Sequence, residues 1–221
     1  YHVLPELAGI WILNPQTDEP RRLLEGFWVS PAWSPDGRKL AAVRDPNADP
    51  QIWVTPIDST SLTQLTFEGM NFAPYWSPDG QWIAYDSNLQ GNTRIWIMRP
   101  DGSEKQAIAT EADSPAWSPD GREIVHVGYP IHYPDEGPYS EIFVINADGS
   151  NDRRLTQNRA DDRFPQFSPD GQRVAYSSQQ TVGDILPEVW IMSNAGTAPR
   201  QLTQHGGTHP TWSPDGTEVV F

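Results

Sequence analysis

The chain has 221 residues, of which 37% are hydrophobic and 20% are charged, and these proportions are typical of a globular protein. Its formal net charge of −14 at pH 7 disfavours binding to nucleic acid, which needs a basic protein surface. The absence of cysteine excludes disulfides, thiolate metal sites and cysteine nucleophiles. No apolar run reaches the ~18 residues that would cross a bilayer, so we expect no membrane insertion.

A short motif, Trp-Ser-Pro-Asp-Gly, recurs along the chain. It begins at Trp33, Trp76, Trp117 and Trp212, with a variant that begins at Phe167. The intervals between these first residues are 43, 41, 50 and 45 residues. A period of this length is typical of solenoids and propellers, and it predicts one domain of five repeats that spans residues 1–221.

Each repeat predicts four strands, and residues 71–110 show this best. A first strand at 72–77 leads into a Ser-Pro-Asp-Gly turn, and an alternating second strand follows at 81–86. A polar loop then leads to a third strand at 94–98, a second turn around Asp101, and a weaker fourth strand at 105–109. No segment has the 3.6-residue apolar period of a helix. The sequence therefore predicts an all-β, five-bladed propeller of four-stranded antiparallel blades.

The two ends of the chain complement one another in this scheme. Residues 10–13 resemble a third strand, and residues 218–221 resemble a second strand. The turn glycine precedes the next third strand by 15 residues in two repeats (Gly37 to Ile52 and Gly80 to Ile95), and joining Phe221 to Tyr1 would give the same interval. We therefore expect residues 10–13 to pair with residues 219–221 and to close the ring. A sixth blade beyond Phe221 is the alternative.

The motif Pro-x-Trp-Ser-Pro-Asp-Gly, followed by Ile-Trp-x-Met and Asp-Gly, resembles the WD-like repeat of the TolB propeller family. Residues 74–80, 94–98 and 101–102 show it most fully. This resemblance covers all five repeats and implies a periplasmic or secreted protein that binds protein partners. Similar repeats also form propellers of prolyl-oligopeptidase-like enzymes and of some lyases.

Most of the conspicuous residues have a structural interpretation. The motif aspartates (Asp36, Asp79, Asp120, Asp170, Asp215) suit hairpin turns, and eight of the ten tryptophans hold repeat positions typical of a core between blades. Asp45-x-Asn47-x-Asp49 lacks the glycine and glutamate of a calcium loop. His205 and His209 lie in a glycine-rich loop and lack the shared helix face of a zinc peptidase motif. We expect no catalytic residues, no metal site and no cofactor.

Departures from the repeat locate the candidate binding residues. The loop from Gly128 to Ser140 is longer than its counterparts, and residues 179–188 form a smaller expansion. Both join second to third strands, so they share one rim with the fourth-to-first connections, and loops on a rigid scaffold often carry binding residues. The predicted contacts are Trp28, Phe72, Tyr129, His132, Tyr133, Tyr139, Arg163 and His209.

These observations predict a non-catalytic scaffold that binds a protein or peptide partner on that rim. The alternative is the propeller of an enzyme, either a gating propeller of a serine peptidase or a metal-dependent carbohydrate-active propeller. The first alternative needs a hydrolase domain outside these residues. The second needs donors at the channel mouth, for which His205, His209 and Asp162 are the candidates.

Overall fold

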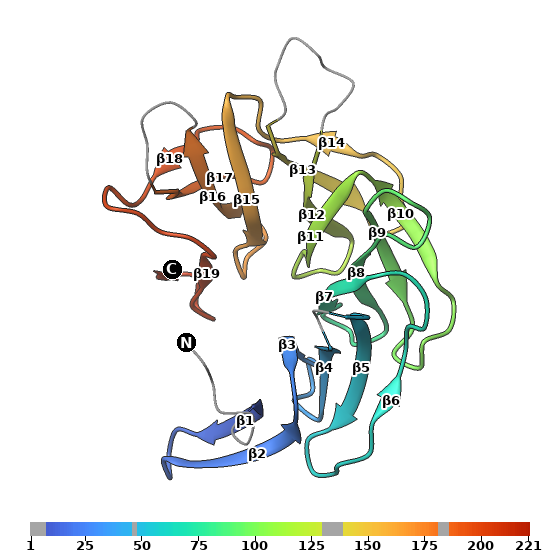
Figure 1. Cartoon of the computed structure of the whole chain (residues 1–221). Coiled ribbons are helices and arrows are strands. Elements are labelled where there is room, and N and C mark those ends of the chain that lie inside the picture. The colour runs from blue at the N-terminus through green and yellow to red at the C-terminus, as the bar shows by residue number, and fades with distance from the viewer. Residues whose placement is uncertain (1–7, 46–47, 130–138, 181–185) are drawn as a thin grey trace.

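Strands arranged around an open arc make up the protein (Figure 1). The computed structural model describes residues 8–45, 48–129, 139–180 and 186–221, and these contain twenty β-strands and no helix. Accordingly, none of the described residues belongs to a helix that could span a membrane. The predicted all-β class is confirmed.

Sixteen of the strands form four antiparallel blades of four strands each. The innermost strands are β3 (Trp28–Trp33), β7 (Asn71–Trp76), β11 (Ala112–Trp117) and β15 (Ala160–Phe167). The second strands are β4 (Lys39–Arg44), β8 (Ile83–Ser87), β12 (Glu123–Gly128) and β16 (Arg173–Gln180). The third strands are β5 (Gln51–Pro56), β9 (Arg94–Met98), β13 (Glu141–Asn146) and β17 (Glu188–Ser193). The outermost strands are β6 (Thr63–Gln64), β10 (Gln106–Thr110), β14 (Arg153–Arg154) and β18 (Arg200–Gln201).

Two separate hairpins form the ends of the arc. The N-terminal hairpin pairs β1 (Gly9–Asn14) with β2 (Glu19–Glu25), and the C-terminal hairpin pairs β19 (Thr211–Trp212) with β20 (Val219–Val220). The first has the place of third and fourth strands, because it precedes an innermost strand. The second consists of a first and a second strand. These four strands lie outside the four blades, two near each end of the chain.

The motif turns are held by their own side chains. In the second blade, Ser77 Oγ donates to Asp79 Oδ1 at 2.5 Å, and the backbone N–H of Gln81 donates to the same oxygen at 2.9 Å. Gly80 has a φ of 69°, which suits glycine. These hydrogen bonds lower the pKa of Asp79. The same Ser–Asp contact recurs at Asp36, Asp120, Asp170 and Asp215, so the predicted structural role of the motif aspartates is confirmed.

Neighbouring blades bury apolar faces against each other. One core cluster joins the first and second blades, a second joins the second and third, and a third joins the third and fourth. The motif tryptophan adds a hydrogen bond across the interface: Trp76 Nε1 donates to the carbonyl oxygen of Ala32 at 3.2 Å, and Trp117 Nε1 to that of Tyr75 at 3.1 Å. We call this contact the tryptophan latch. Trp212 makes it with Gln166 at 3.3 Å.

The expectation that all eight repeat tryptophans lie in a core is wrong for two of them. Trp33 is 49% exposed and Trp11 is 45% exposed, whereas Trp76 and Trp117 are 6% and 5% exposed. Trp33 lies in the first blade and Trp11 in the N-terminal hairpin, at the open end of the arc (Figure 1). A repeat position is buried by the blade that packs against it, and at the end of the arc that blade is missing.

The predicted ring closure is not formed in the structure. Strand β1 pairs with β2 alone and β20 with β19 alone among the described residues, so the two ends remain unpaired. Figure 1 shows the resulting gap between the hairpins. Residue spacing sets the register of a connection, but closure also depends on the angle between neighbouring blades. The packing of whole blade faces against each other sets that angle, and the angle cannot be derived from the residue spacing.

Candidate functional site

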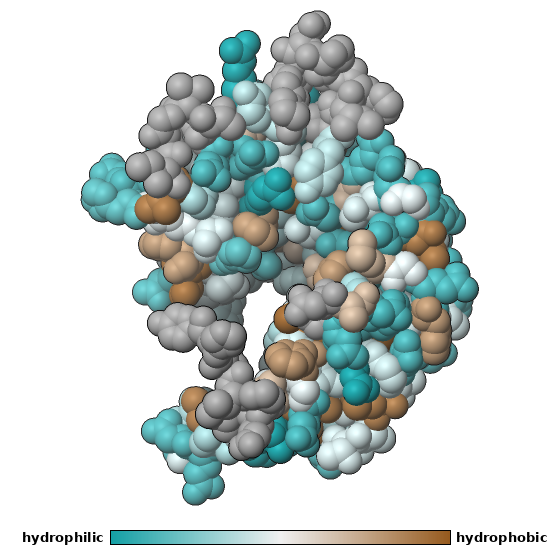
Figure 2. All heavy atoms as spheres, viewed as in Figure 1, coloured by the Kyte–Doolittle hydropathy of each residue, from teal (hydrophilic) through white to brown (hydrophobic). Residues whose placement is uncertain are grey.

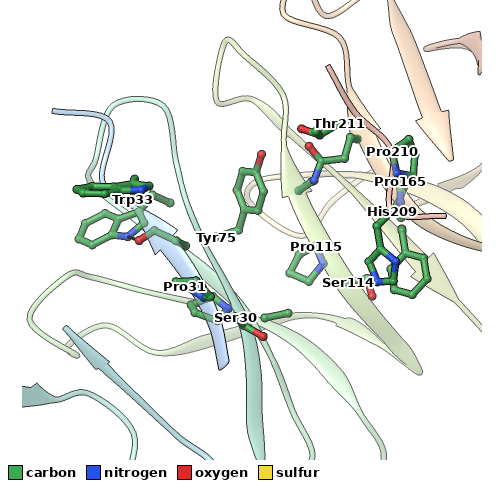
Figure 3. A pocket seen from close by; sticks show the side chains of 17 residues that line it. Ser30, Pro31, Trp33, Tyr75, Ser114, Pro115, Pro165, His209, Pro210 and Thr211 are labelled. Atoms are coloured by element: carbon green, nitrogen blue, oxygen red, sulfur yellow. Dashed lines mark hydrogen bonds between the residues drawn. The ribbon is translucent and has the colours of Figure 1, made fainter. Parts of the chain in front are cut away.

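A pocket of about 700 Å³ lies at the centre of the arc, where the innermost strands approach each other. Figure 2 shows the hollow from one face, and Figure 3 shows Tyr75 between Trp33 on one side and His209 on the other. The described lining contains no Asp, Glu, Lys or Arg, and comprises residues 30–33, 73–76, 114–116, 164–166 and 209–211. The pocket is therefore neutral and largely apolar, with a few polar groups.

Each lining segment has an unusual backbone conformation immediately before a proline. The residues that precede the five prolines have positive φ angles, namely Ser30 (52°), Ala73 (47°), Ser114 (55°), Phe164 (55°) and His209 (54°). This conformation is uncommon for residues other than glycine and clusters at functional sites. In all four blades the pairing register shifts at this point. This conformation turns a backbone N–H toward the preceding blade: Ser114 donates to Asp86 Oδ1 at 2.9 Å, and His209 donates to Ser177 Oγ at 3.2 Å.

A second hollow adjoins the pocket, and we call it the rim cavity. It has a volume of about 290 Å³, and its lining comprises Met70, Phe72, Asp86, Asn88, Thr93, Asp113, Ser114 and Arg163. Ser114 also lines the central pocket, so the two hollows are neighbours. The cavity lies on the rim that carries the second-to-third and fourth-to-first connections, which we call the loop rim. The Asp-Gly hairpin turns lie on the opposite rim, the turn rim.

The walls of the rim cavity are strongly acidic on one side. Asp86 is 8% exposed, and its burial and the charge of Asp113 raise its pKa well above the ordinary value. Asp113 Oδ2 accepts a 2.5 Å hydrogen bond from the Tyr129 hydroxyl. Burial and this contact with Asp113 raise the pKa of Tyr129 to about 12, so the hydroxyl stays protonated and donates. Arg163 lies 3.5 Å from the Tyr129 oxygen and 3.9 Å from Asp161 Oδ1.

Comparison with known proteins identifies the family to which this repeat belongs. The family model described as the TolB beta propeller domain matches residues 8–129 and 110–221. The chain belongs to this family. The match covers every blade and both hairpins, and it confirms the family that the sequence resembled.

Individual relatives resemble this TolB-type propeller over part of their length. The Tol-Pal system protein TolB of Anaeromyxobacter sp. (strain K) is 32% identical over 118 residues, which is 51% of this chain and 25% of that protein. A solved TolB-like protein from Agrobacterium tumefaciens has a TM-score of 0.81 at 23% identity, over 96% of this chain and 76% of that one. An oligogalacturonate lyase solved in complex with manganese has a TM-score of 0.73 at 16% identity, over 97% of this chain and 68% of that one. At these identities the two structures show the fold alone.

Four of the eight predicted contact residues lie at the two hollows of this propeller. Phe72 and Arg163 line the rim cavity, and Tyr129 is hydrogen-bonded to its wall residue Asp113. His209 lines the central pocket, where its ring stacks on Phe164 with 3.6 Å between the centroids. A binding role for each of them stays a prediction.

The other four predicted residues lie elsewhere. Trp28 donates its indole N–H to the carbonyl oxygen of Glu25 at 2.9 Å, beside the N-terminal hairpin. Tyr139 is half-buried and lines neither hollow. His132 and Tyr133 lie outside the described residues.

Sequence reasoning missed the residues that give the loop rim its charge and shape. Asp86 and Asp113 face each other across the second and third blades, although 27 positions separate them in the sequence. A signal was present at Asp86, because it stands where the first and third blades have Val43 and Val127, as the pairing registers show. The fourth blade has Ser177 at this position, so an acid here is a departure from the repeat within a strand, not in a loop.

A buried polar site is filled differently at two interfaces between blades. Between the first and second blades, Asn71 Nδ2 of β7 donates to Gln51 Oε1 of β5 at 3.1 Å. Between the third and fourth blades, Glu141 has the place of Gln51 at the start of β13, and Asp162 of β15 has the place of Asn71. Both acids are at most 1% exposed. Glu141 Oε1 is 2.7 Å from Arg154 Nη2, whereas Glu141 Oε2 and Asp162 Oδ1 have no hydrogen-bond partner among the described residues.

Neither of these acids belongs to a metal-binding arrangement in the described part of the chain. No group of three or more His, Asp or Glu side chains there is placed to hold a metal ion. Burial, with a contribution from the charge of Glu141, raises the pKa of Asp162 to about 6, although Asn158 donates a hydrogen bond to its Oδ2. Asp162 is therefore protonated only below a pH of about 6, beside the ion pair of Glu141 and Arg154.

Proposed function

We propose that this chain is a non-catalytic interaction module that binds a protein or peptide partner on its loop rim. The observation that carries the proposal is the adjacency of the rim cavity and the central pocket, which share Ser114. Two neighbouring hollows with aromatic, polar and charged walls offer the mixed chemistry of protein interfaces. Membership of the TolB beta propeller domain family supports a role of this kind.

The resemblance to a Tol-Pal system protein supports a periplasmic location and a partner within such a system. The chain spans about a quarter of the length of that relative, so both inferences are proposals. The net charge of −14 favours a partner with a basic or neutral contact surface.

We also propose that the two end hairpins are the halves of a fifth blade. The exposed Trp33 supports this, because a closed ring would place the C-terminal hairpin where Trp33 could form the missing tryptophan latch. By the register of the intact blades Leu13 would lie opposite Val219, and the chain has no cysteine, so cysteines introduced for Leu13 and Val219 would be the sole thiols. Rapid disulfide formation in the monomer would support closure, and its absence beside a folded chain would contradict it.

The alternative is the propeller of an enzyme, and the oligogalacturonate lyase neighbour supports it at the level of the fold. A gating role in a peptidase would need a hydrolase domain outside these residues. A metal-dependent lyase role would need donors at the channel mouth. His209, one candidate donor, instead stacks on Phe164 and lies 3.1 Å from the Thr208 hydroxyl through Nδ1.

Site-specific photo-crosslinking tests the proposed binding rim. A photoreactive phenylalanine analogue replaces Phe72 on the loop rim in one variant and Asp101 on the turn rim in the matched control. We expect the Phe72 variant to crosslink one partner in cells that express the protein, and the Asp101 variant to leave that partner unmodified. Binding of the purified partner should then weaken about tenfold in Phe72→Ser, which corresponds to ~1.4 kcal/mol. Crosslinks confined to Asp101 would contradict the proposal.

A further inference from the structure

The rim cavity is too small for a typical free ligand but suits one long side chain. Its volume of about 290 Å³ lies just below the range of small-molecule pockets, which is ~300–1,000 Å³. Met70 and Phe72 give it apolar wall area near the mouth, and Met70 is 49% exposed. Asp86 and Asp113 give it an acidic wall beyond.

Asp86 gives this cavity a buried carboxyl group with an oxygen that is free to accept a hydrogen bond. Its side chain is more than nine-tenths buried and lines the cavity, and one of its oxygens accepts the Ser114 N–H. Its other oxygen has no hydrogen bond to any described residue, and no described Lys or Arg forms an ion pair with it. A buried carboxylate without a compensating cation is costly, and burial raises the pKa of Asp86 accordingly.

The neighbouring charges leave the negative side of the cavity uncompensated. Asp113 forms no ion pair with a described residue, and its partner is the neutral Tyr129 hydroxyl. Arg163 also lines the cavity, but its guanidinium lies 3.9 Å from Asp161, a carboxylate that already attracts it. One arginine therefore faces three carboxylates, and the surplus of negative charge lies at Asp86 and Asp113.

We propose that the rim cavity binds the cationic end of a lysine or arginine side chain that the partner inserts from the loop rim. This inference rests on the proposed function of that rim as the binding surface. The ammonium or guanidinium group donates to the free oxygen of Asp86 and compensates Asp86 and Asp113. The aliphatic stem packs on Met70 and Phe72, as such stems do on apolar surface, and Phe72 offers a ring face to the cation.

The proposal can be tested on the purified chain with two short peptides. The probe is acetyl-Gly-Lys-Gly-amide, and the neutral control is acetyl-Gly-norleucine-Gly-amide, which keeps the stem and lacks the charge. In NMR titrations we expect the lysine peptide to shift the backbone amides of Asn88 and Thr93 with saturation. The norleucine peptide should shift them at least fivefold less at the same concentration. Equal shifts from both peptides would overturn the proposal.

A matched pair of variants tests whether the charge of Asp86 is the one that binds the lysine peptide. Asp86→Asn keeps an oxygen that can accept the Ser114 N–H and removes the negative charge, so folding should be retained while the affinity for the lysine peptide falls at least fivefold. Asp101→Asn makes the same change on the turn rim and should leave that affinity unchanged. If Asp86→Asn fails to fold, Asp113→Asn serves instead, because its side-chain oxygen can still accept the Tyr129 hydroxyl. Unchanged affinity in the folded variant would overturn the proposal.

The partner experiment separates this inference from the proposed function. If Phe72 crosslinks the partner and Asp86→Asn binds that partner as tightly as the unaltered chain, the rim is a binding surface that does not use a cationic anchor. If the lysine peptide binds in an Asp86-dependent way but no partner crosslinks at Phe72, the cavity is a cation site and the proposed rim function is wrong. Both outcomes differ from the expected one, in which Asp86→Asn weakens both the peptide and the partner.

Discussion

The interior of the arc and its N-terminal end use the same sequence motif with opposite results. Trp76 and Trp117 are buried and bonded to the carbonyl oxygens of the preceding blade, while Trp33 opens an identical five-residue motif and is 49% exposed. The exposed large apolar residues of the ends include Trp11, Leu13, Val220 and Phe221. A motif residue is thus stabilised by its neighbour blade, and the motif alone does not bury it.

The interior blades also differ from one another at equivalent positions. The third interface lacks the tryptophan latch, because Phe167 replaces tryptophan and has no N–H to donate. The interface between the third and fourth blades holds Glu141 and Asp162 where the interface between the first and second holds Gln51 and Asn71. Equivalent positions in different blades thus carry different residues, and the following three predictions compare such positions.

The largest effect is expected when a latch residue is removed from the interior. Trp117→Ala should lower the free energy of unfolding by about 3–5 kcal/mol, because it leaves a cavity between the second and third blades. Trp33→Ala is the matched control at the end of the arc and should cost less than about 1 kcal/mol. Urea denaturation measures both. Equal losses would mean that the ring is closed in solution and that Trp33 is buried there.

A smaller effect on stability, dependent on pH, should distinguish the interface between the third and fourth blades from the interface between the first and second. The pKa of Asp162 is raised in the folded state to about 6, above its value near 3.9 in the unfolded chain. Its contribution to stability is therefore fully present below pH ~4 and is lost as the pH rises through about 6. Relative to Asp162→Asn, the unaltered chain should lose on the order of 2–3 kcal/mol between pH 4 and pH 7.

The Asp162→Asn variant makes the interface between the third and fourth blades resemble the interface between the first and second, where Asn71 already occupies this place. The comparison must be made as a difference between the two proteins, since the motif aspartates, whose pKa values are lowered, destabilise both chains at acid pH. Parallel stability curves across this pH range would show that Asp162 is ionised as an ordinary carboxyl.

The smallest effect isolates the hydrogen bond of the latch. Trp117→Phe removes the donor to the Tyr75 carbonyl and keeps most of the apolar contact, so it should cost about 1–2 kcal/mol. Trp33→Phe removes a donor that forms no latch at the open end, and its cost should be within about 0.5 kcal/mol. Thermal or urea unfolding of the two variants checks this. A loss at Trp33 as large as that at Trp117 would indicate a latch to the C-terminal hairpin.

Much of the candidate site was accessible from the sequence because it follows the repeat. The loop rim could be predicted, since the order of strands fixes which connections share an end of the blades. Phe72, Tyr129, Arg163 and His209 were predicted as contacts in this way, and they lie at or beside the two hollows; their binding role stays a prediction. Asp86 and Asp113 were not, because they meet across an interface between two blades, and a single repeat contains no information on which residues of its neighbour lie opposite.

The sequence by itself determined the all-β class, the four-stranded antiparallel blade and the role of the motif aspartates. Turn chemistry and strand periodicity are local, so a single repeat is enough to specify them. Tertiary structure decided which tryptophans are buried, where the rim cavity lies and whether the ends meet. These features depend on the angles and contacts between blades, which arise when whole faces pack together. The gap between β1 and β20 is the clearest case, because the residue spacing fitted a closed ring while the packed arc leaves it open.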